Sequence, residues 1–470
     1  MTMTFQHVHM IGIGGIQMSA VAKLLHRSGI HVTGSDVATS PQIDELRNAG
    51  VTIILGHAST NIPAETELVI YTSAIPELNV ERAEARRRSL PQYTNFAFLA
   101  EWFGERKMIL VTGTHGKSTT TAMLGLMAEK GALDPTVVVG SKVPQFPDGN
   151  IRFGQSDFVI IEGDEYERHF LHFHPMGVVI NNIEWDHTDV FAHVSDLVEA
   201  FRQLLTQVQD RGWVIVNADD RHVSTLIGQE RSRLEGRGIR IVTFGCASHA
   251  DIQLVDFVSQ NDGQQFSLRD ETGIATRMRM TVPGKMNAMN ATAASVMGRS
   301  LGIPFETAKV ALLAFRGIWR RFEKISDQNG IVVISDYAHH PTAVAATLEA
   351  TKSFYPGRRL VVCFQPHHHH RTRHLFLEFV PCFDKADILI LTEIYDVVGR
   401  EQAEDRTISS RDLQDAIIRH DADRACVRQV DYAPHPEEAR VLLKRLSKSG
   451  DVLLVMGAGD IYTIAPKIFS

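Results

Sequence analysis

The stretch from Met108 to Thr120 constrains the fold of this chain more than any other. It reads Met-Ile-Leu-Val-Thr-Gly-Thr-His-Gly-Lys-Ser-Thr-Thr, an apolar run followed by a glycine-bracketed turn, and a helix-prone segment continues to Gly131. Where a parallel strand delivers its carboxyl end to a helix N-terminus, backbone N–H groups and the helix dipole point at an anion, and a lysine adds positive charge. The stretch therefore predicts an α/β domain that binds a nucleoside triphosphate at this turn.

The predicted nucleotide loop is shorter than the usual pattern. The consensus G-x-x-x-x-G-K-[ST] would place glycine at position 111, where Val111 stands. A solvated turn before a helix is the alternative, but the strand before the loop and the helix after it favour phosphate binding. A hydroxyl directly after the lysine suits one coordination position of Mg²⁺. We assign Gly113, Thr114, His115, Gly116, Lys117, Ser118 and Thr119 to the nucleotide, and Ser118 also to the metal.

Two acidic clusters follow apolar runs further along the chain. The run 158–161 ends in Glu-Gly-Asp-Glu at 162–165, and the run 177–180 leads to Asn-Asn-Ile-Glu-Trp-Asp-His at 181–187. In parallel sheets such strand ends lie at the ligand-binding edge. If the nucleotide loop shares that edge, Glu165 and His187 can reach Mg²⁺ on the phosphates. Helix capping would explain one such cluster alone.

The first 36 residues read as strand, glycine turn, helix and strand. Gly12, Gly14 and Gly15 form the turn, and Asp36 follows the second strand at the spacing of a dinucleotide fingerprint, although Gln17 stands at the third glycine position. A nicotinamide or flavin site, the diphosphate of another nucleotide, and a structural turn without a ligand all remain open at this point.

The C-terminal part repeats the same arrangement. The run 330–334 precedes Asp336, His339 and His340, and the run 360–364 precedes four histidines at 367–370 and then Arg371. Four neighbouring histidines cannot all converge on one ion, so a metal site is not expected there. A charged loop facing a carboxylate or phosphate, with Arg371 as the fork-shaped donor, is favoured.

Length and composition bound the remaining possibilities. A chain of 470 residues is too long to fold around a single hydrophobic core, and we place domains at 1–106, 107–323 and 324–470. We expect an antiparallel insertion in the middle domain over 250–282, with a turn at 260–263. The formal charge of −7 argues against nucleic acid and anionic membranes as partners. Four scattered cysteines and the absence of a long apolar run predict a cytoplasmic protein.

The order of the motifs resembles that of the Mur ligase family. The motifs are G-I-G-G-I-Q-M at 12–18, G-S-D at 34–36, T-G-T-H-G-K-S-T-T-T at 112–121, E-G-D-E at 162–165, N-N-I-E-W-D-H at 181–187, R-R-F at 320–322, D-Y-A-H-H-P-T at 336–342, F-Q-P-H at 364–367 and G-A-G-D at 457–460. Each motif alone is modest, but their joint order is specific and spans nearly the whole chain. The similarity is greatest to the branch that joins L-alanine to UDP-N-acetylmuramate.

The resemblance implies a fold, a reaction and site residues. It implies a Rossmann-like UDP-sugar domain, a P-loop ATPase domain and a Rossmann-like C-terminal domain, which together use ATP and Mg²⁺ to join a carboxylate to an amine in peptidoglycan precursor synthesis. The implied catalytic residues are Lys117, Glu165, His187, His339 and Arg371. Asn287, Arg320 and Asp336 join the nucleotide site, Ser118, Glu165 and His187 hold the metal, and Gly14, Gly15, Asp36, Ser73, His367 and Arg371 bind the substrates.

The chain departs from the family pattern at three places. Gln17 replaces a glycine, Met286 replaces a histidine before Asn287, and His368 to His370 replace the more usual R-Y-T. The last change affects the expected amino-acid pocket. A ligase that attaches a recycled muropeptide is an alternative, because N-N-I-E-W-D-H-T-D-V-F at 181–191 and E-Y-E at 165–167 resemble that relative somewhat more. A nicotinamide-dependent dehydrogenase is an alternative of another class, but it rests on residues 12–36 alone and leaves the P-loop unexplained.

Overall fold

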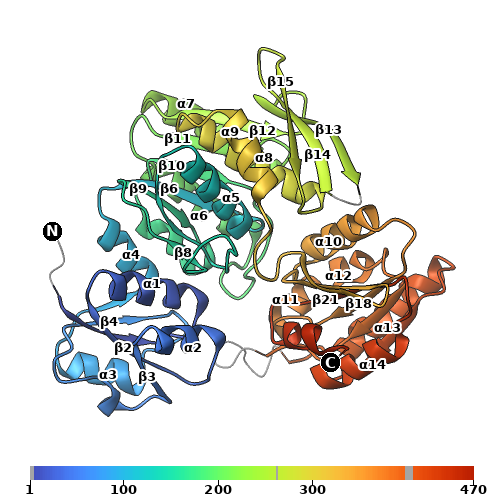
Figure 1. The fold of residues 1–470 in the computed structure, drawn as a ribbon, viewed down its shortest axis with the longest axis horizontal. Helices are drawn as coiled ribbons and strands as arrows, with labels where there is room; N and C mark the ends of the chain where they lie inside the picture. Colours follow the sequence, from blue (N-terminus) through green and yellow to red (C-terminus); the bar gives the residue numbers. More distant parts are fainter. Residues whose placement is uncertain (1–4, 261–262, 397–405, 470) are drawn as a thin grey trace.

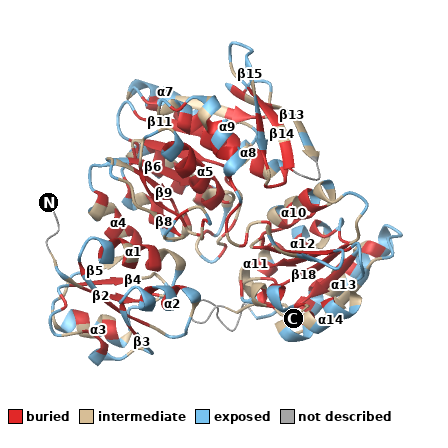
Figure 2. Ribbon diagram, in the orientation of Figure 1, coloured by how far each residue is buried: buried red, intermediate tan, exposed pale blue. Residues whose placement is uncertain are grey.

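Three sheets, one in each domain, organise the chain (Figure 1). The structure is a computed structural model that describes residues 5–260, 263–396 and 406–469. The predicted three-domain α/β architecture is confirmed. The buried side chains concentrate on the strands and on the helix faces that cover them (Figure 2).

The N-terminal domain is a parallel sheet in the order β3-β2-β1-β4-β5. The sheet forms because apolar residues of β1 and β4 are buried on both faces, with Met10 and Ile70 on one face and Ile11 and Val69 on the other. Its elements are β1 (His7–Ile11), α1 (Ile16–Arg27), β2 (His31–Asp36), α2 (Pro41–Asn48), β3 (Thr52–Leu55), β4 (Leu68–Tyr71), α3 (Val80–Arg87), β5 (Gln92–Thr94) and α4 (Asn95–Phe103).

The central domain holds a ten-stranded sheet in the order β15-β14-β13-β12-β11-β10-β6-β9-β7-β8. Its strands are β6 (Lys107–Thr112), β7 (Thr136–Val138), β8 (Ile151–Arg152), β9 (Phe158–Glu162), β10 (Gly177–Ile180), β11 (Trp213–Asn217), β12 (Arg240–Gly245), β13 (Ile252–Gln260), β14 (Gly263–Arg269) and β15 (Ala275–Met280). Its helices are α5 (Lys117–Lys130), α6 (Val194–Gln207), α7 (Arg221–Gly236), α8 (Lys285–Ser300) and α9 (Phe305–Ala314), with a 3₁₀ segment η2 (Tyr166–His172).

The predicted antiparallel segment extends the edge of this sheet. β13, β14 and β15 pair antiparallel, and β13 continues the sheet parallel to β12. Residues 261 and 262 of the expected turn lie outside the described residues. At the other side of the sheet, β6 lies between β9 and β10 and runs parallel to both. The nucleotide loop and the two acidic clusters therefore leave the sheet at one edge.

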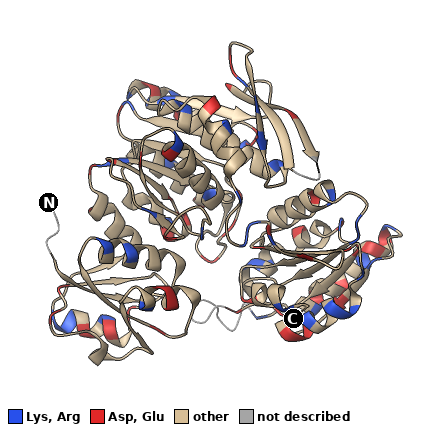
Figure 3. Ribbon diagram, viewed as in Figure 1, with Lys and Arg blue, Asp and Glu red and all other residues tan. Residues whose placement is uncertain are grey.

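The C-terminal domain contains a six-stranded sheet in the order β16-β17-β21-β18-β19-β20, parallel except for β16. Its elements are β16 (Glu323–Gln328), β17 (Ile331–Asp336), α10 (Pro341–Phe354), β18 (Leu360–Phe364), α11 (His369–His374), α12 (Phe376–Cys382), β19 (Ile388–Leu391), α13 (Ser410–Asp423), β20 (Gln429–Tyr432), α14 (Pro436–Leu446) and β21 (Val452–Met456). The outer helices α13 and α14 carry both signs of charge (Figure 3).

The domains differ in how they pack on one another. One apolar cluster runs from the N-terminal domain into the central domain, where Phe96 of α4 stacks on His169 and meets Phe173 edge to face. The C-terminal domain has its own apolar clusters, against which Trp185 and Met286 of the central domain pack. Within the described residues, no helix is long and apolar enough to cross a membrane.

Candidate active site

The nucleotide loop joins β6 to α5 and requires glycine at position 116. Gly116 has φ of 80°, and a Cβ there would lie 2.2 Å from the Asn290 side-chain oxygen. The loop is held by Asn182, whose side-chain oxygen accepts a hydrogen bond from the His115 amide at 2.7 Å and whose carbonyl accepts one from the Thr114 amide at 3.1 Å. The backbone therefore has the conformation of an anion-binding turn at the start of a helix.

Lys117 points from this loop toward the acidic end of β9. Its Nζ lies 2.8 Å from both carboxylate oxygens of Glu165 and 2.8 Å from the Gly113 carbonyl oxygen. Burial lowers the pKa of Lys117, but the charges of Glu165 and Asp164 outweigh burial and raise it, so the side chain is a cation. The predicted phosphate-binding lysine and the predicted metal-binding carboxylate form one ion pair.

Ser118 contacts a different carboxylate of the same cluster. Its hydroxyl donates to Glu162 Oε1 at 2.9 Å, and Glu162 Oε2 accepts from the Gly140 amide at 2.6 Å. Burial raises the pKa of Glu162 above its ordinary value. Ser118 thus hydrogen-bonds Glu162, while Glu165 hydrogen-bonds Lys117.

Glu165 and His187 lie together, and Asp164 joins them. Ligand atoms of the three residues lie within 4.8 Å of one another, and His187 Nε2 is 3.4 Å from Glu165 Oε1. His187 has a left-handed backbone with φ of 50°, which is uncommon for a residue with a side chain and is typical of functional sites. Burial lowers the pKa of His187, but the Asp186 charge and the bond to Glu165 outweigh it and raise that pKa. The two carboxylates suit a hard divalent cation.

Arg371 reaches this region from the C-terminal domain. Its Nε donates to Asp186 Oδ1 at 2.7 Å, and the two side chains are only 6% and 4% exposed. His339 Nδ1 lies 2.9 Å from the Tyr337 carbonyl oxygen, which leaves its Nε2 as the unprotonated nitrogen, 4.0 Å from Asp186. Burial, followed by the Arg371 charge, holds the pKa of His339 and of His367 well below the ordinary value, so both rings are neutral.

Two cavities collect most of the predicted residues. A cavity of about 550 Å³ lies where the three domains meet, and its lining includes Gly14, Gly15, Ser73, Thr114, His115, Gly116, Lys117, Ser118, His187, Arg320, His339, His367 and Arg371. A cavity of about 340 Å³ lies between the central and C-terminal domains, and its lining includes His115, Gly116, Thr119, Asn287 and Asp336.

Three predicted residues are not among the described residues that line either cavity. Asp36 accepts a hydrogen bond from the Gly14 amide at 2.8 Å, so its carboxylate fixes the glycine turn. Gly113 offers its carbonyl to Lys117, and Glu165 is fully buried beneath that lysine. The expected contact of Asp36 with a sugar hydroxyl stays a prediction.

Sequence reasoning missed several residues that the fold adds. Asp186, Glu184 and Asp164 were part of the acidic motifs but received no role of their own, and His340 and Thr188 received none either. Thr188 lies 2.6 Å from His370 across the domain boundary. Their common signal is a position in the loop that follows a parallel strand, either of the central sheet or, for His340, of the C-terminal sheet, and this position does not tell which acid faces which domain.

Comparison with known proteins adds an independent observation. Three family models match consecutive parts of the chain: "Mur ligase family, catalytic domain" at 7–106, "Mur ligase middle domain" at 111–298, and "Mur ligase, glutamate ligase domain" at 320–459. A UDP-N-acetylmuramate–L-alanine ligase of Desulforamulus reducens is 36% identical over 98% of this chain and 96% of its own length.

Solved structures agree with these matches. The UDP-N-acetylmuramate–alanine ligase of Thermotoga maritima superposes with a TM-score of 0.82 at 27% identity, covering 98% of both chains. A murein peptide ligase of Psychrobacter arcticus superposes with a TM-score of 0.72 at 24% identity, again over 98% of both chains, and at that identity it shows a shared fold.

Proposed function

The chain belongs to the Mur ligase family, and on that premise we propose that it is an ATP-dependent ligase that joins L-alanine to the lactyl carboxylate of UDP-N-acetylmuramate in peptidoglycan precursor synthesis. One observation carries the proposal. The 550 Å³ cavity brings the phosphate-binding Lys117, the glycine turn at Gly14 and Gly15, and the basic group Arg371 to one space from three domains. We assign the ATP phosphates to the Lys117 side of this cavity, the UDP-sugar to the glycine turn and the amino acid to Arg371.

The reaction follows from the chemistry of its parts. A carboxylate is a poor acylating agent, so the γ-phosphoryl group of ATP is transferred to the lactyl carboxylate and gives an acyl phosphate. The amine then attacks the acyl carbon, and inorganic phosphate leaves. Lys117 offsets the negative charge of the transferring group. Arg371 lines the amine end of the cavity, where its guanidinium suits the carboxylate of an amino acid.

His339 is better placed than His187 to act as the general base. His339 lines the cavity and its neutral ring has an unprotonated Nε2, whereas the raised pKa of His187 favours the protonated form, which cannot accept a proton. We therefore propose that His339 takes the proton that the amine nitrogen loses as it attacks the acyl carbon, and that His187 belongs to the metal site.

A Mg²⁺ ion fits the donor set on the nucleotide side. Asp164, Glu165 and His187 would hold it, with the Ser118 hydroxyl on the adjacent helix start. The ion would neutralise phosphate charge during transfer. We also propose a cytoplasmic reaction, because ATP and UDP-sugars are cytoplasmic metabolites.

The two alternatives are not favoured. Among the relatives above, the L-alanine ligase is the more similar, and the muropeptide ligase shares the fold. A nicotinamide-dependent dehydrogenase rested on residues 12–36, and a Mur ligase match over those residues accounts for the same glycine turn.

A phosphate-release assay with L-alanine, glycine, L-serine and the muramyl tripeptide side by side tests the proposed function. We expect release to require ATP, UDP-N-acetylmuramate and an amine together, with L-alanine the most effective. If the tripeptide is the one amine that stimulates release in the presence of ATP and UDP-N-acetylmuramate, the muropeptide alternative is established. If no amine stimulates release, the chain is not this ligase.

A further inference from the structure

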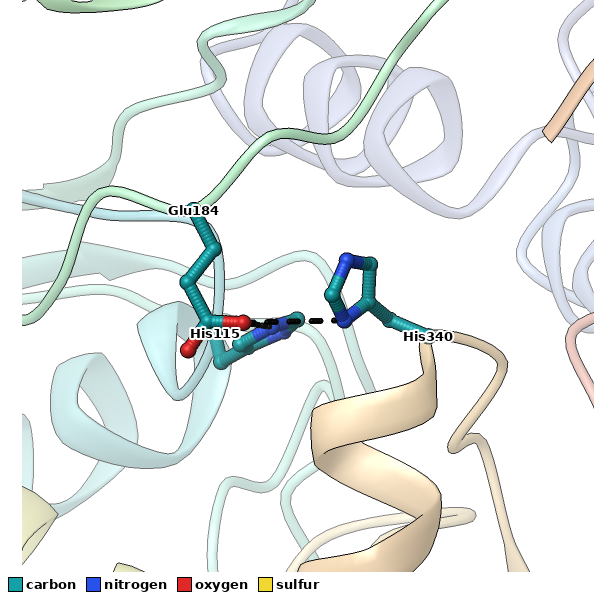
Figure 4. Close-up of side chains that lie close together, drawn as sticks. All are labelled: His115, Glu184 and His340. Carbon is teal, nitrogen blue, oxygen red and sulfur yellow. Dashed lines mark ion pairs between the residues drawn. The ribbon is translucent and has the colours of Figure 1, made fainter. Parts of the chain in front are cut away.

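A second cluster of metal-ligating side chains joins the central and C-terminal domains (Figure 4). His115 comes from the nucleotide loop, Glu184 from the segment after β10, and His340 directly precedes α10. Each offers one ligand atom, and these atoms lie within 4.8 Å of one another. Glu184 Oε2 is 3.4 Å from His115 Nε2 and 3.6 Å from His340 Nδ1. Neither Glu184 nor His340 has a role in the proposed ligase reaction.

His340 turns an unprotonated nitrogen toward this cluster. Its Nε2 lies 3.2 Å from the Trp185 carbonyl oxygen, which only accepts, so Nε2 carries the proton. Its Nδ1 accepts a long 3.4 Å hydrogen bond from the Thr342 amide, which only donates. Nδ1 is therefore the unprotonated nitrogen, and it lies 3.6 Å from Glu184 Oε2, where a bound cation could take its lone pair in place of the long contact with Thr342. Metal-bound histidines usually have this arrangement, in which the second ring nitrogen donates to a carbonyl.

His115 and Glu184 are also prepared to bind a cation. Among the described residues, the buried Nε2 of His115 has no hydrogen-bond partner of good geometry. Burial raises the pKa of Glu184, but its contact with His115 outweighs burial and holds that pKa at about 2, so the carboxylate is ionised. Burial lowers the pKa of His340 to about 4, so its ring is neutral at neutral pH.

Two of the three separations in the cluster match a tetrahedral ion, and the third, between the two histidines, is at most 4.8 Å. Ligands about 2.0–2.1 Å from a tetrahedral zinc ion lie roughly 3.3–3.4 Å from one another. The two separations from Glu184, 3.4 and 3.6 Å, are close to this value. Two imidazole nitrogens and one carboxylate oxygen suit a transition metal ion, whereas the more oxygen-rich group of Asp164, Glu165 and His187 suits Mg²⁺.

We propose that His115, Glu184 and His340 form a separate site for a divalent transition metal ion of the zinc class, with its fourth position open. Two ligands belong to the central domain and one to the C-terminal domain, so the bound ion ties the two domains together. Because His115 also lines the cavity with Asn287 and Asp336, the ion lies at the wall of the predicted nucleotide site.

Titration of the full-length, metal-free protein with Co²⁺ tests the site, with Mg²⁺ in excess to occupy the oxygen-rich group. We expect one equivalent of Co²⁺ to give the visible absorption of a tetrahedral ion. His340→Gln and Glu184→Gln, which change each side of the domain boundary, should each weaken this binding by more than the roughly 10- to 100-fold that loss of an outer-shell partner costs. His249→Gln, at an exposed position outside the cluster, is the matched control and should bind as the parent does.

Two further measurements keep the test decisive. Zn²⁺ should raise the thermal unfolding midpoint of the parent and of His249→Gln but not of His340→Gln, while the metal-free midpoints show that all variants fold. Binding that survives both cluster substitutions overturns the proposal. Binding that His187→Gln removes also overturns it, since the ion then belongs to the oxygen-rich group. None of these outcomes bears on the ligase activity.

Discussion

The buried pair between Asp186 and Arg371 offers the sharpest test of how the site is assembled. Asp186→Asn keeps the size of the side chain and one acceptor oxygen, and removes only the charge that faces Arg371 at 2.7 Å. Removing one partner of a buried ion pair typically costs about 3–5 kcal/mol, because the other charge is left without compensation. Burial raises the pKa of Asp186, but the charges of Arg371 and His187 outweigh burial and hold that pKa well below its ordinary value, so the negative charge is present at neutral pH.

The location of the pair determines where this cost appears. Asp186 belongs to the central domain and Arg371 to the C-terminal domain, so a stranded guanidinium can regain water if the domains separate. The cost then appears as lost closure rather than as lost stability of either domain. At 1.36 kcal/mol per tenfold change, 3–5 kcal/mol corresponds to a fall in kcat/KM for the amine of roughly 10²- to 10⁴-fold, as an upper range.

Steady-state kinetics with varied L-alanine measure this effect, and UDP-N-acetylmuramate binding provides the internal reference. We expect UDP-sugar affinity to change little, because its predicted residues lie in the N-terminal domain. Asp210→Asn is the matched control: Asp210 pairs with Arg237 at 2.8 Å, but the two side chains are 73% and 29% exposed, and such surface pairs contribute about 0–1 kcal/mol. A loss in Asp186→Asn no larger than in Asp210→Asn would refute the assigned role of the buried pair.

Three further predictions concern other parts of the molecule. Lys117→Ala should abolish phosphate release and leave UDP-sugar binding nearly intact by calorimetry; equal loss of both would contradict the separation of the two sites. His339→Gln should lower kcat by roughly 10²- to 10⁴-fold, the usual contribution of a general base, and an unchanged pH–rate profile would contradict that role. Burial raises the pKa of Glu81, but hydrogen bonds from His9, Ser35 and Asn61 outweigh it and lower that pKa below 4.5. The stabilisation by the Glu81 carboxylate is therefore complete above about pH 4.5 and is lost as the pH falls below that value. Measured by scanning calorimetry, Glu81→Gln should lower the free energy of unfolding by about 2 kcal/mol or more at pH 7 and by less near pH 4. The loss should exceed that of the control Glu84→Gln at either pH.

The parts of the site that the sequence predicts are those that depend on one sheet. β6 lies between β9 and β10, with Val111 beside Glu162 and Thr112 beside Ile180. The loops after these three strands therefore meet, and the proximity of Lys117, Glu165 and His187 follows from parallel pairing alone. Fold class follows for the same reason, since alternating apolar runs and helical segments leave few other architectures.

The parts of the site that were not predicted depend on contacts between domains or on hydrogen bonds within a single domain. The pairs of Asp186 with Arg371 and of Glu184 with His340 exist only because two separately folded domains meet, and no local pattern encodes their mutual orientation. Asp36 has the expected spacing, and its Oδ2 accepts a hydrogen bond from the Gly14 amide, while its contact with a substrate stays a prediction. A short-range hydrogen bond within the domain is as compatible with the pattern as a ligand is.

The ion pair between Lys117 and Glu165 constrains how the nucleotide enters. Both groups are largely buried, with side chains 15% and 1% exposed, so separating them with only one new partner present would leave a charge uncompensated. A triphosphate alone would satisfy Lys117 and leave Glu165 with only its 3.4 Å contact to His187, and a divalent cation alone would satisfy Glu165 and leave Lys117 without its partner carboxylate. When the triphosphate and the cation bind together, the buried pair of Lys117 with Glu165 is replaced by two pairs, Lys117 with phosphate and Glu165 with the cation. The ion pair therefore favours the metal complex of the nucleotide over either component, and it holds the lysine at the loop until that complex binds.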